Sequence, residues 1–369
     1  MNIMKKLLPI LLGALAISTA NAYDNNNTCE PTPAPQCCDP CECKPCEPCA
    51  PCCEVPGEPT TPAYNQSAAI DVCNCWDFYV TGTFLWVQPI QEQMEFAATT
   101  NADGATSYHK MDFEWKPAFK VGLGYNFQYD KWDGFVEYTR INSEMHHNAK
   151  LGDNVSPVAG FWLLTQTNPN PVDEIKNKWN LDFNTFDFNL GRAFWNGTKL
   201  SFRCNYGFKA GWIDQKINQE EIATAAATTI SGDFKSDSWL IGPRVGICSS
   251  WNLGEGFRLF GNGAASVFYQ KFHKISWNEP LISDTSASFG SGSESYGVIN
   301  SALEAMVGLG YGTYFDRNNW HFDLMLGYEA QLFFDQNAAR HIEQLKNLNV
   351  TKPGNLMFHG LNITARLDF

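Results

Sequence analysis

Cysteine carries the most reactive side chain in this sequence, and eleven of its thirteen copies lie between residues 29 and 75. Spacings such as Cys41-Glu42-Cys43 and Cys46-Glu47-Pro48-Cys49 suit two chemistries, disulfide formation and thiolate binding of zinc. Oxidising conditions outside the cytoplasm favour disulfides, so we expect disulfides in an exported chain, with zinc as the alternative. The disulfide candidates are Cys29, Cys37, Cys38, Cys41, Cys43, Cys46, Cys49, Cys52, Cys53, Cys73 and Cys75.

Histidines form no convincing catalytic group in the sequence. His146 and His147 fall in a predicted loop, and His273, His341 and His359 lie near loops or strand ends. Neither an HExxH nor a GxSxG motif is present. We therefore expect no enzymatic activity, no cofactor and no bound metal. A hydrolase, which would need paired Asp and His side chains, is kept as a rival hypothesis.

Charged residues recur on the polar face of segments in which apolar and polar residues alternate. Rings of such charges set ion preference in pores, whereas internal salt bridges would fill a narrow barrel, and both interpretations stay open. The predicted pore-lining residues are Lys116, Lys120, Glu137, Asp182, Arg203, Lys209, Arg244, Arg258, Glu304, Asp323, Glu329 and Arg366.

The N-terminus has the pattern of an export signal. Lys5 and Lys6 precede an apolar run over 7–17, and small residues end at Ala22. The run has about 11 residues, whereas a membrane-spanning helix needs roughly 20. We therefore assign 1–22 as a signal peptide that is cleaved after Ala22.

Residues 23–75 form a second region, dominated by Pro, Cys and acidic residues. Almost no aliphatic side chains are available there for a core, so we expect a disordered periplasmic segment.

The formal net charge of the chain is -13, which disfavours a nucleic-acid partner because such a partner needs a basic face.

Alternation with period two begins at residue 76 and continues to the end of the chain. In 199–213, every second residue from Leu200 to Trp212 is apolar or aromatic except Cys204, whereas the other set contains Arg203 and Lys209. The same pattern predicts ten strands, at 76–88, 115–128, 132–142, 178–192, 199–213, 237–250, 257–273, 299–315, 320–334 and 355–369.

Long and short connections alternate between these strands, as in bacterial outer-membrane barrels. We therefore predict a transmembrane antiparallel up-and-down β-barrel over 76–369. Twelve strands are the alternative if Met94–Thr99, Val158–Thr167 or Ile222–Ile230 also span. A soluble β-sandwich would alternate too, but its strands are usually shorter.

Cys204 and Cys248 fall on opposite faces of neighbouring strands, which disfavours a bond between them.

The C-terminus ends in an amphipathic strand with apolar Ile363 and Leu367 before the terminal Phe369. An exposed edge strand of this kind can pair with the outer-membrane assembly machinery while the aromatic residue anchors at the inner interface. A second local pattern, with Ala338, Ile342 and Leu345 at helical spacing, predicts a short helix over 336–349.

Several stretches resemble one family. Phe78-Tyr79-Val80-Thr81-Gly82-Thr83-Phe84-Leu85-Trp86, the segment 115–140, Asp187-Phe188-Asn189-Leu190-Gly191-Arg192 and Ile241-Gly242-Pro243-Arg244-Val245-Gly246 are similar to the major outer membrane protein family of Legionella and Chlamydia-related bacteria. The resemblance covers most of 76–369 and implies a pore-forming barrel. It implies nothing about the cysteine-rich segment.

These features lead to one main functional hypothesis, a porin in the bacterial outer membrane through which small hydrophilic solutes or ions diffuse. The cysteine-rich segment would join barrels to each other or to other cysteine-rich envelope proteins through disulfides. Further expected partners are outer-membrane lipid, the assembly machinery and two more copies in a homotrimer. The alternative is a structural or adhesive barrel with a plugged lumen.

Overall fold

The structure is a computed structural model that describes residues 65–73, 77–100, 103–127, 129–150, 156–158, 172–224, 227–280, 288–341 and 353–369. The predicted signal peptide, nearly all of the cysteine-rich segment and every disulfide candidate except Cys73 lie outside these residues.

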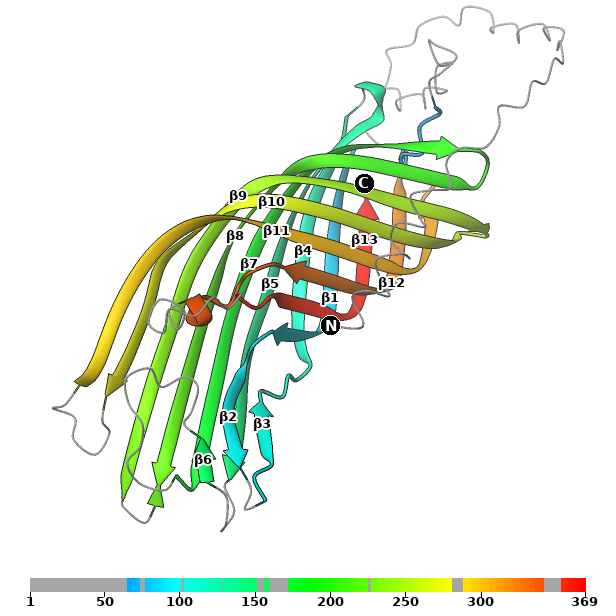
Figure 1. Cartoon of the computed structure of the whole chain (residues 1–369). Helices are drawn as coiled ribbons and strands as arrows, with labels where there is room; N and C mark the ends of the chain where they lie inside the picture. The colour runs from blue at the N-terminus through cyan, green and yellow to red at the C-terminus, as the bar shows by residue number, and fades with distance from the viewer. Residues whose placement is uncertain are drawn as a thin grey trace, which may run out of the picture. The chain divides into compact units, whose positions relative to one another are not determined.

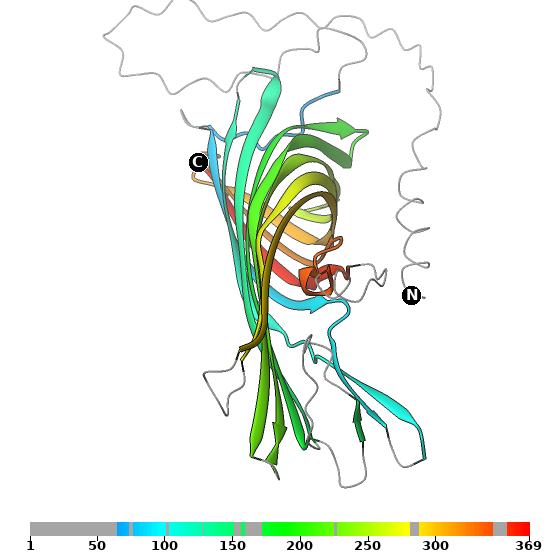
Figure 2. The same ribbon diagram turned by 60° about the vertical axis from the view of Figure 1, so that its left-hand side comes forward.

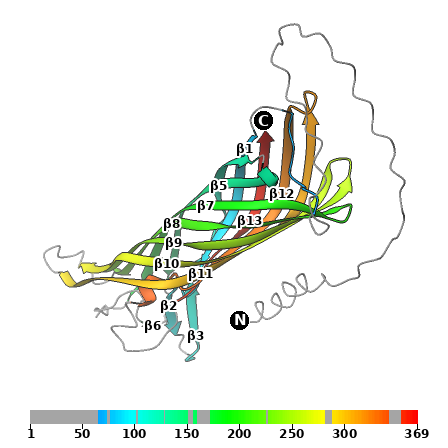
Figure 3. The same cartoon turned by 90° about the horizontal axis from the view of Figure 1, so that it is seen from above.

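Ten antiparallel strands close into a barrel, as the alternation predicts (Figure 1). They are β1 (Phe78–Gln91), β4 (Lys116–Asn126), β5 (Trp132–Lys150), β7 (Glu174–Asn196), β8 (Leu200–Ala223), β9 (Thr228–Gly254), β10 (Phe257–Pro280), β11 (Ser288–Phe315), β12 (Trp320–Phe333) and β13 (Leu356–Asp368). The ring closes where β1 pairs with β13, and Figure 3 shows these two strands side by side.

The segments considered as extra membrane strands do not join the barrel. Met94–Thr99 overlaps β2 (Glu95–Thr100), which forms a separate sheet with β3 (Thr106–Lys110) and β6 (Ser156–Val158). Ile222–Ile230 covers the end of β8 and the start of β9. The stretch Val158–Thr167 lies outside the described residues after position 158.

Short connections gather at one end of the barrel, which we call the inner end. They include the 3-10 turn η1 (Tyr129–Lys131) between β4 and β5 and the four residues between β11 and β12. The C-terminus lies at the same end, where the backbones of Phe369 and Phe78 exchange two hydrogen bonds of 3.0 and 3.2 Å. The opposite end is called the outer end.

An apolar band covers the outside of the barrel next to the inner end. On β8 the outward side chains Tyr206, Phe208 and Trp212 are 53%, 59% and 49% exposed, whereas the inward Lys209 is buried. Aromatic rings pack together at the inner margin of the band, as Phe257 does against Tyr311 at 4.9 Å between centroids. This is the surface that a lipid-facing barrel requires.

Beyond the band, the long strands β5 and β7 to β11 continue outward (Figure 2). In these outer parts the apolar residues change faces. On β7, Phe186 and Phe188 point outward and are 43% and 45% exposed. Further along the same strand, Trp179, Leu181 and Phe183 point inward and are buried. The strand has no bulge between the two sets, so the same register presents an apolar outside at one end and an apolar inside at the other.

Two smaller predictions concern local structure. Residues 338–341 are helical, as expected for the start of the 336–349 helix, and the following residues lie outside the described ranges. Cys204 is exposed and Cys248 is half-buried inside the barrel, and the two thiols are not bonded to each other.

Within the described ranges, no helix combines the length and the apolar character that crossing a membrane would need.

We predict that Phe369→Asp will impair assembly, because the closing strand then loses the terminal aromatic residue that anchors its end. Phe257→Asp is the matched control, since Phe257 occupies the same inner margin at the start of β10. Heat-modifiable mobility on gels reports the folded barrel. Equal amounts of heat-modifiable protein in the two variants would contradict a special role for Phe369.

Candidate functional site

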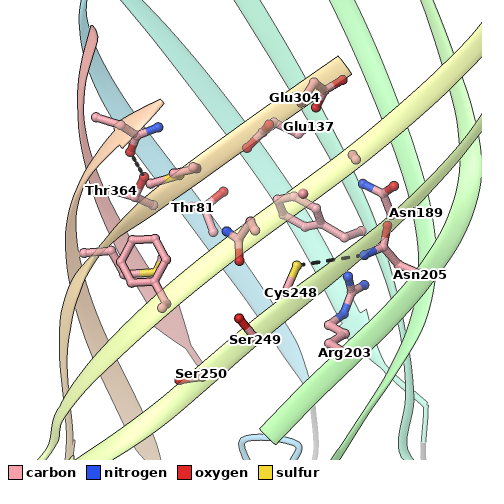
Figure 4. Close-up of a pocket in the computed structure, with 18 of the residues that line it drawn as sticks. Thr81, Glu137, Asn189, Arg203, Asn205, Cys248, Ser249, Ser250, Glu304 and Thr364 are labelled. Atoms are coloured by element: carbon pink, nitrogen blue, oxygen red, sulfur yellow. Dashed lines mark hydrogen bonds between the residues drawn. The ribbon is translucent and has the colours of Figure 1, made fainter. Parts of the chain in front are cut away.

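A polar chamber of about 340 Å³ occupies the inner half of the barrel (Figure 4). Amide and hydroxyl side chains such as Asn189, Asn205 and Thr81 line it together with charged groups. Of the twelve predicted pore-lining residues, the chamber wall includes Lys120, Glu137, Arg203, Arg244, Arg258, Glu304, Glu329 and Arg366.

One ion-pair group connects β7 to β11 at the outer side of this chamber, next to the Phe333 ring. The Lys209 ammonium lies 2.7 Å from a carboxylate oxygen of Asp187 and 3.0 Å from one of Glu304. Arg244 approaches Glu304 at 2.7 Å and donates a second hydrogen bond, of 2.8 Å, to the Asn189 side chain. The Lys209 side chain is only 1% exposed, so its charge depends on these carboxylates.

Further polar contacts link β1, β4, β5, β12 and β13. Lys120 donates to Glu329 and lies 3.8 Å from Glu137. The Asn362 amide donates to the other oxygen of Glu329 at 2.6 Å. The Arg366 guanidinium stacks 3.7 Å above the centre of the Tyr79 ring.

The remaining arginines of the chamber are also paired. Arg203 forms a bidentate contact with Asp133, at 2.6 Å for the shortest pair of atoms. Arg258 pairs with Asp323, and Arg366 with Asp368. Each predicted pore-lining cation in the chamber wall therefore has a carboxylate partner, so the charges on the chamber wall neutralise one another.

Asp133 and Asp187 belong to this network but are absent from the predicted set. Asp133 has the same parity on β5 as Glu137, so counting back along the strand would have found it. Asp187 points inward from β7, but in the outer half of this strand the apolar residues point inward too, so the alternation does not mark Asp187 as a lumen residue.

Asp182 is the opposite case, a residue that was predicted to line the pore but does not. It lies on the outer surface of β7, beyond the apolar band, and not in the lumen. Its cross-strand neighbour is Asp214 of β8, where burial, followed by the charge of Asp237, raises the pKa of the carboxyl. The prediction that Asp182 lines the lumen was therefore wrong. Beyond the apolar band the barrel is surrounded by water, so the polar face of the strand is its outer face.

Lys116 points inward, as expected, but it lies at the outer end of β4 away from the chamber. Its ammonium is 2.7 Å from a carboxylate oxygen of Glu114. Among the residues the structure describes, no cluster of three or more His, Cys, Asp or Glu side chains is arranged to hold a metal.

Above the chamber, an aromatic layer fills the barrel from wall to wall. We define this layer as Trp179, Phe183, Phe268, Phe333 and Phe358, all of them at most 2% exposed. The Phe183 ring is 5.1 Å from the Phe333 ring and 4.7 Å from the Phe358 ring, between centroids. Because β7 and β12 lie on opposite walls in the strand order, the Phe183–Phe333 contact spans the lumen.

The apolar cluster around this layer includes at least one side chain from each of the ten barrel strands. The chain after β12 then folds into the barrel on the outer side of the layer. Gln336 is fully buried there, and its side-chain amide exchanges two hydrogen bonds of 2.9 Å with that of Gln270. Gln215 donates to the backbone carbonyl of Gln336 at 3.2 Å. The described residues therefore close the lumen at its outer half.

Comparison with known proteins identifies one matching family. A family model described as Legionella pneumophila major outer membrane protein precursor matches residues 71–369. No curated protein matches the sequence. The solved structures that are similar include the outer membrane protease OmpT from Escherichia coli, with 12% identity, a TM-score of 0.41, and coverage of 79% of this chain and 96% of that chain.

Two further solved structures are more distant. The toluene transporter TodX from Pseudomonas putida has 9% identity and a TM-score of 0.28, with 80% of this chain and 89% of that chain covered. The attachment invasion locus protein Ail of Yersinia pestis has 11% identity and a TM-score of 0.20, with 79% and 99% covered. At these values the likenesses assign no activity to the chain.

The similarity to OmpT nevertheless corrects one expectation. A solved outer-membrane protease is among the similar structures, so the exclusion of enzymatic activity made from the sequence is withdrawn.

We predict that Lys209→Ala will lower the free energy of unfolding by about 3–5 kcal/mol, because Asp187 and Glu304 would then be buried without their cation. Lys235→Ala is the matched control, since Lys235 pairs with Asp237 on the exposed surface, where such a pair contributes about 0–1 kcal/mol. Urea unfolding in detergent micelles, followed by tryptophan fluorescence, measures both. Equal losses would show that the chamber network does not stabilise the barrel.

Proposed function

The chain belongs to the Legionella pneumophila major outer membrane protein family, and from this premise we propose that it is a closed structural barrel with exposed outer strands. Its location in the outer membrane, expected from the sequence, follows from the same match. The proposal corresponds to the plugged-lumen alternative and not to the diffusion porin that the sequence favoured.

The observation that supports this proposal is the Phe183–Phe333 contact across the lumen, 5.1 Å between ring centroids. A general diffusion pore needs a continuous aqueous path, and an apolar constriction of this kind blocks ions by excluding water. The paired charges of the chamber also favour a packed interior over an ion filter, because a paired arginine has little charge left for a passing anion.

Passive diffusion of small hydrophilic solutes remains the second candidate. The polar chamber of about 340 Å³ supports it, because this half of the barrel would line a pore if the aromatic layer moved aside. The two candidates differ in the conductance of the folded resting protein.

We predict that the folded protein will show no steady conductance in planar bilayers, and that Phe183→Ala combined with Phe333→Ala will create one. Removing two rings leaves a gap in the aromatic layer that closes the lumen above the chamber. Phe186→Ala with Phe188→Ala is the control, since these β7 rings face outward. Open channels from the unaltered protein would favour the porin and remove the closed-barrel proposal.

A finer proposal concerns the cysteine-rich segment. We infer that it joins chains through disulfides, which would stiffen the envelope mechanically, because it has eleven cysteines and few residues for a core. Supporting this, the backbone N–H of Cys73 donates to the carbonyl of Asn318 at the inner end, which is the periplasmic end in barrels of this class. The C-terminal end of the cysteine-rich segment therefore lies on the oxidising, periplasmic side of the membrane.

The expected result on non-reducing electrophoresis of isolated envelopes is high-mass species that collapse to monomer on reduction. A variant with serine at the nine cysteine positions from Cys29 to Cys53 should lack those species and retain the heat-modifiable barrel. A monomer without reductant that carries stoichiometric zinc would instead support the thiolate alternative.

A further inference from the structure

Residues 65–73, which we call the strap, lie against the inner end of the barrel before β1 begins. At their start they pair with the end of β7. The backbone N–H of Ala68 donates to the carbonyl of Ala193 at 3.0 Å, and that of Trp195 donates to the carbonyl of Gln66 at 2.8 Å. Ser67 and Phe194 form an antiparallel bridge between these two bonds.

The other end of the strap is attached on a different part of the rim. The N–H of Cys73 donates to the carbonyl of Asn318 at 2.8 Å, in the turn between β11 and β12. Asp71 also lies close to Tyr314 at the end of β11. In the strand order of the barrel, the three strands β8 to β10 lie between β7 and β11.

A third attachment lies on the opposite side. The Asp71 carboxylate is 2.9 Å from the ammonium of Lys131, which belongs to η1 between β4 and β5. One residue therefore contacts the β4–β5 and the β11–β12 sides of the rim, which lie across the ring from each other. Val72 beside it is buried. These contacts place the middle of the strap across the inner mouth.

The strap attaches to residues of the chamber wall itself. Ala193, whose carbonyl accepts from Ala68, also lines the chamber. Tyr314 packs on the ring of His321, with 4.6 Å between centroids, and His321 contacts Asp368, the ion-pair partner of the chamber residue Arg366. The inner mouth that the strap crosses is thus the opening of the polar chamber.

We propose that the strap is a lid that controls access from the periplasm to the polar chamber. The Asp71–Lys131 pair that holds its middle is solvent-exposed on both sides, at 58% and 34%. Exposed pairs of this kind contribute little, and segments held by few buried contacts open locally at low free energy. The lid is therefore poised to open while the barrel stays folded.

Cys248 provides a native reporter, because its side chain lines the chamber. A water-soluble, negatively charged thiosulfonate is added to the full-length protein in detergent, and modification of the Cys248 peptide is followed by mass spectrometry. Asp71→Lys places two like charges where the ion pair was and should raise the modification rate severalfold. The double variant Asp71→Lys with Lys131→Asp should restore the original slow rate.

Glu255→Lys is the matched control, because it makes the same charge change at another inner turn, between β9 and β10. Its rate should equal that of the unaltered protein. Equal acceleration in Glu255→Lys and Asp71→Lys would mean that charge alone attracts the reagent, and it would overturn the lid. A second variant, Ala68→Pro, removes the N–H that donates to Ala193. An unchanged rate in both Ala68→Pro and Asp71→Lys, with heat-modifiable protein, would also overturn it.

Discussion

The boundary between lipid and water determines which face of each strand is apolar, and the rest of this structure depends on it. Within the membrane the outward face must be apolar, so the alternating residues make the inside polar. Beyond the membrane the same strands are surrounded by water, so their outward face must be polar, and the side chains inside the barrel can form an apolar core. On β7 the change falls between Phe186, which points outward, and Phe183, which points inward. One barrel therefore contains a polar chamber and an aromatic core in series.

This constraint also explains which parts could be predicted from the sequence. The ten strands were predicted correctly because each has a membrane half, such as Tyr206 to Trp212 on β8, in which a single parity carries the apolar side chains. Their outer halves were not, because beyond Trp212 the apolar residues Ile213 and Ile217 occupy the other parity. A pattern that reverses along a strand appears irregular, so the outer halves were interpreted as loops. The error at Asp182 has the same origin.

The charges of the chamber illustrate a second limit of sequence reasoning. Parity alone predicts which side chains enter the lumen, and for Lys120, Arg203 and Arg244 it does so correctly. It cannot distinguish a row of charges that faces a water-filled pore from charges that contact each other across a narrow barrel. That distinction depends on the distances between strands that are remote in sequence, such as the 3.0 Å between Lys209 and Glu304. In a barrel of ten strands, opposite walls are close enough for side chains to meet.

The most direct test of this account is a nitroxide scan along β8 from 206 to 218 in liposomes, with oxygen and a water-soluble nickel complex as paramagnetic relaxation agents. The account predicts that even positions up to 212 are accessible to oxygen in the lipid, and that 214, 216 and 218 are accessible to the nickel complex instead. Positions 213, 215 and 217 should be shielded from both agents, since they face the packed interior. Lipid exposure at 214 to 218, with nickel access at 213 to 217, would mean that the membrane surrounds a water-filled lumen there, and it would contradict the account.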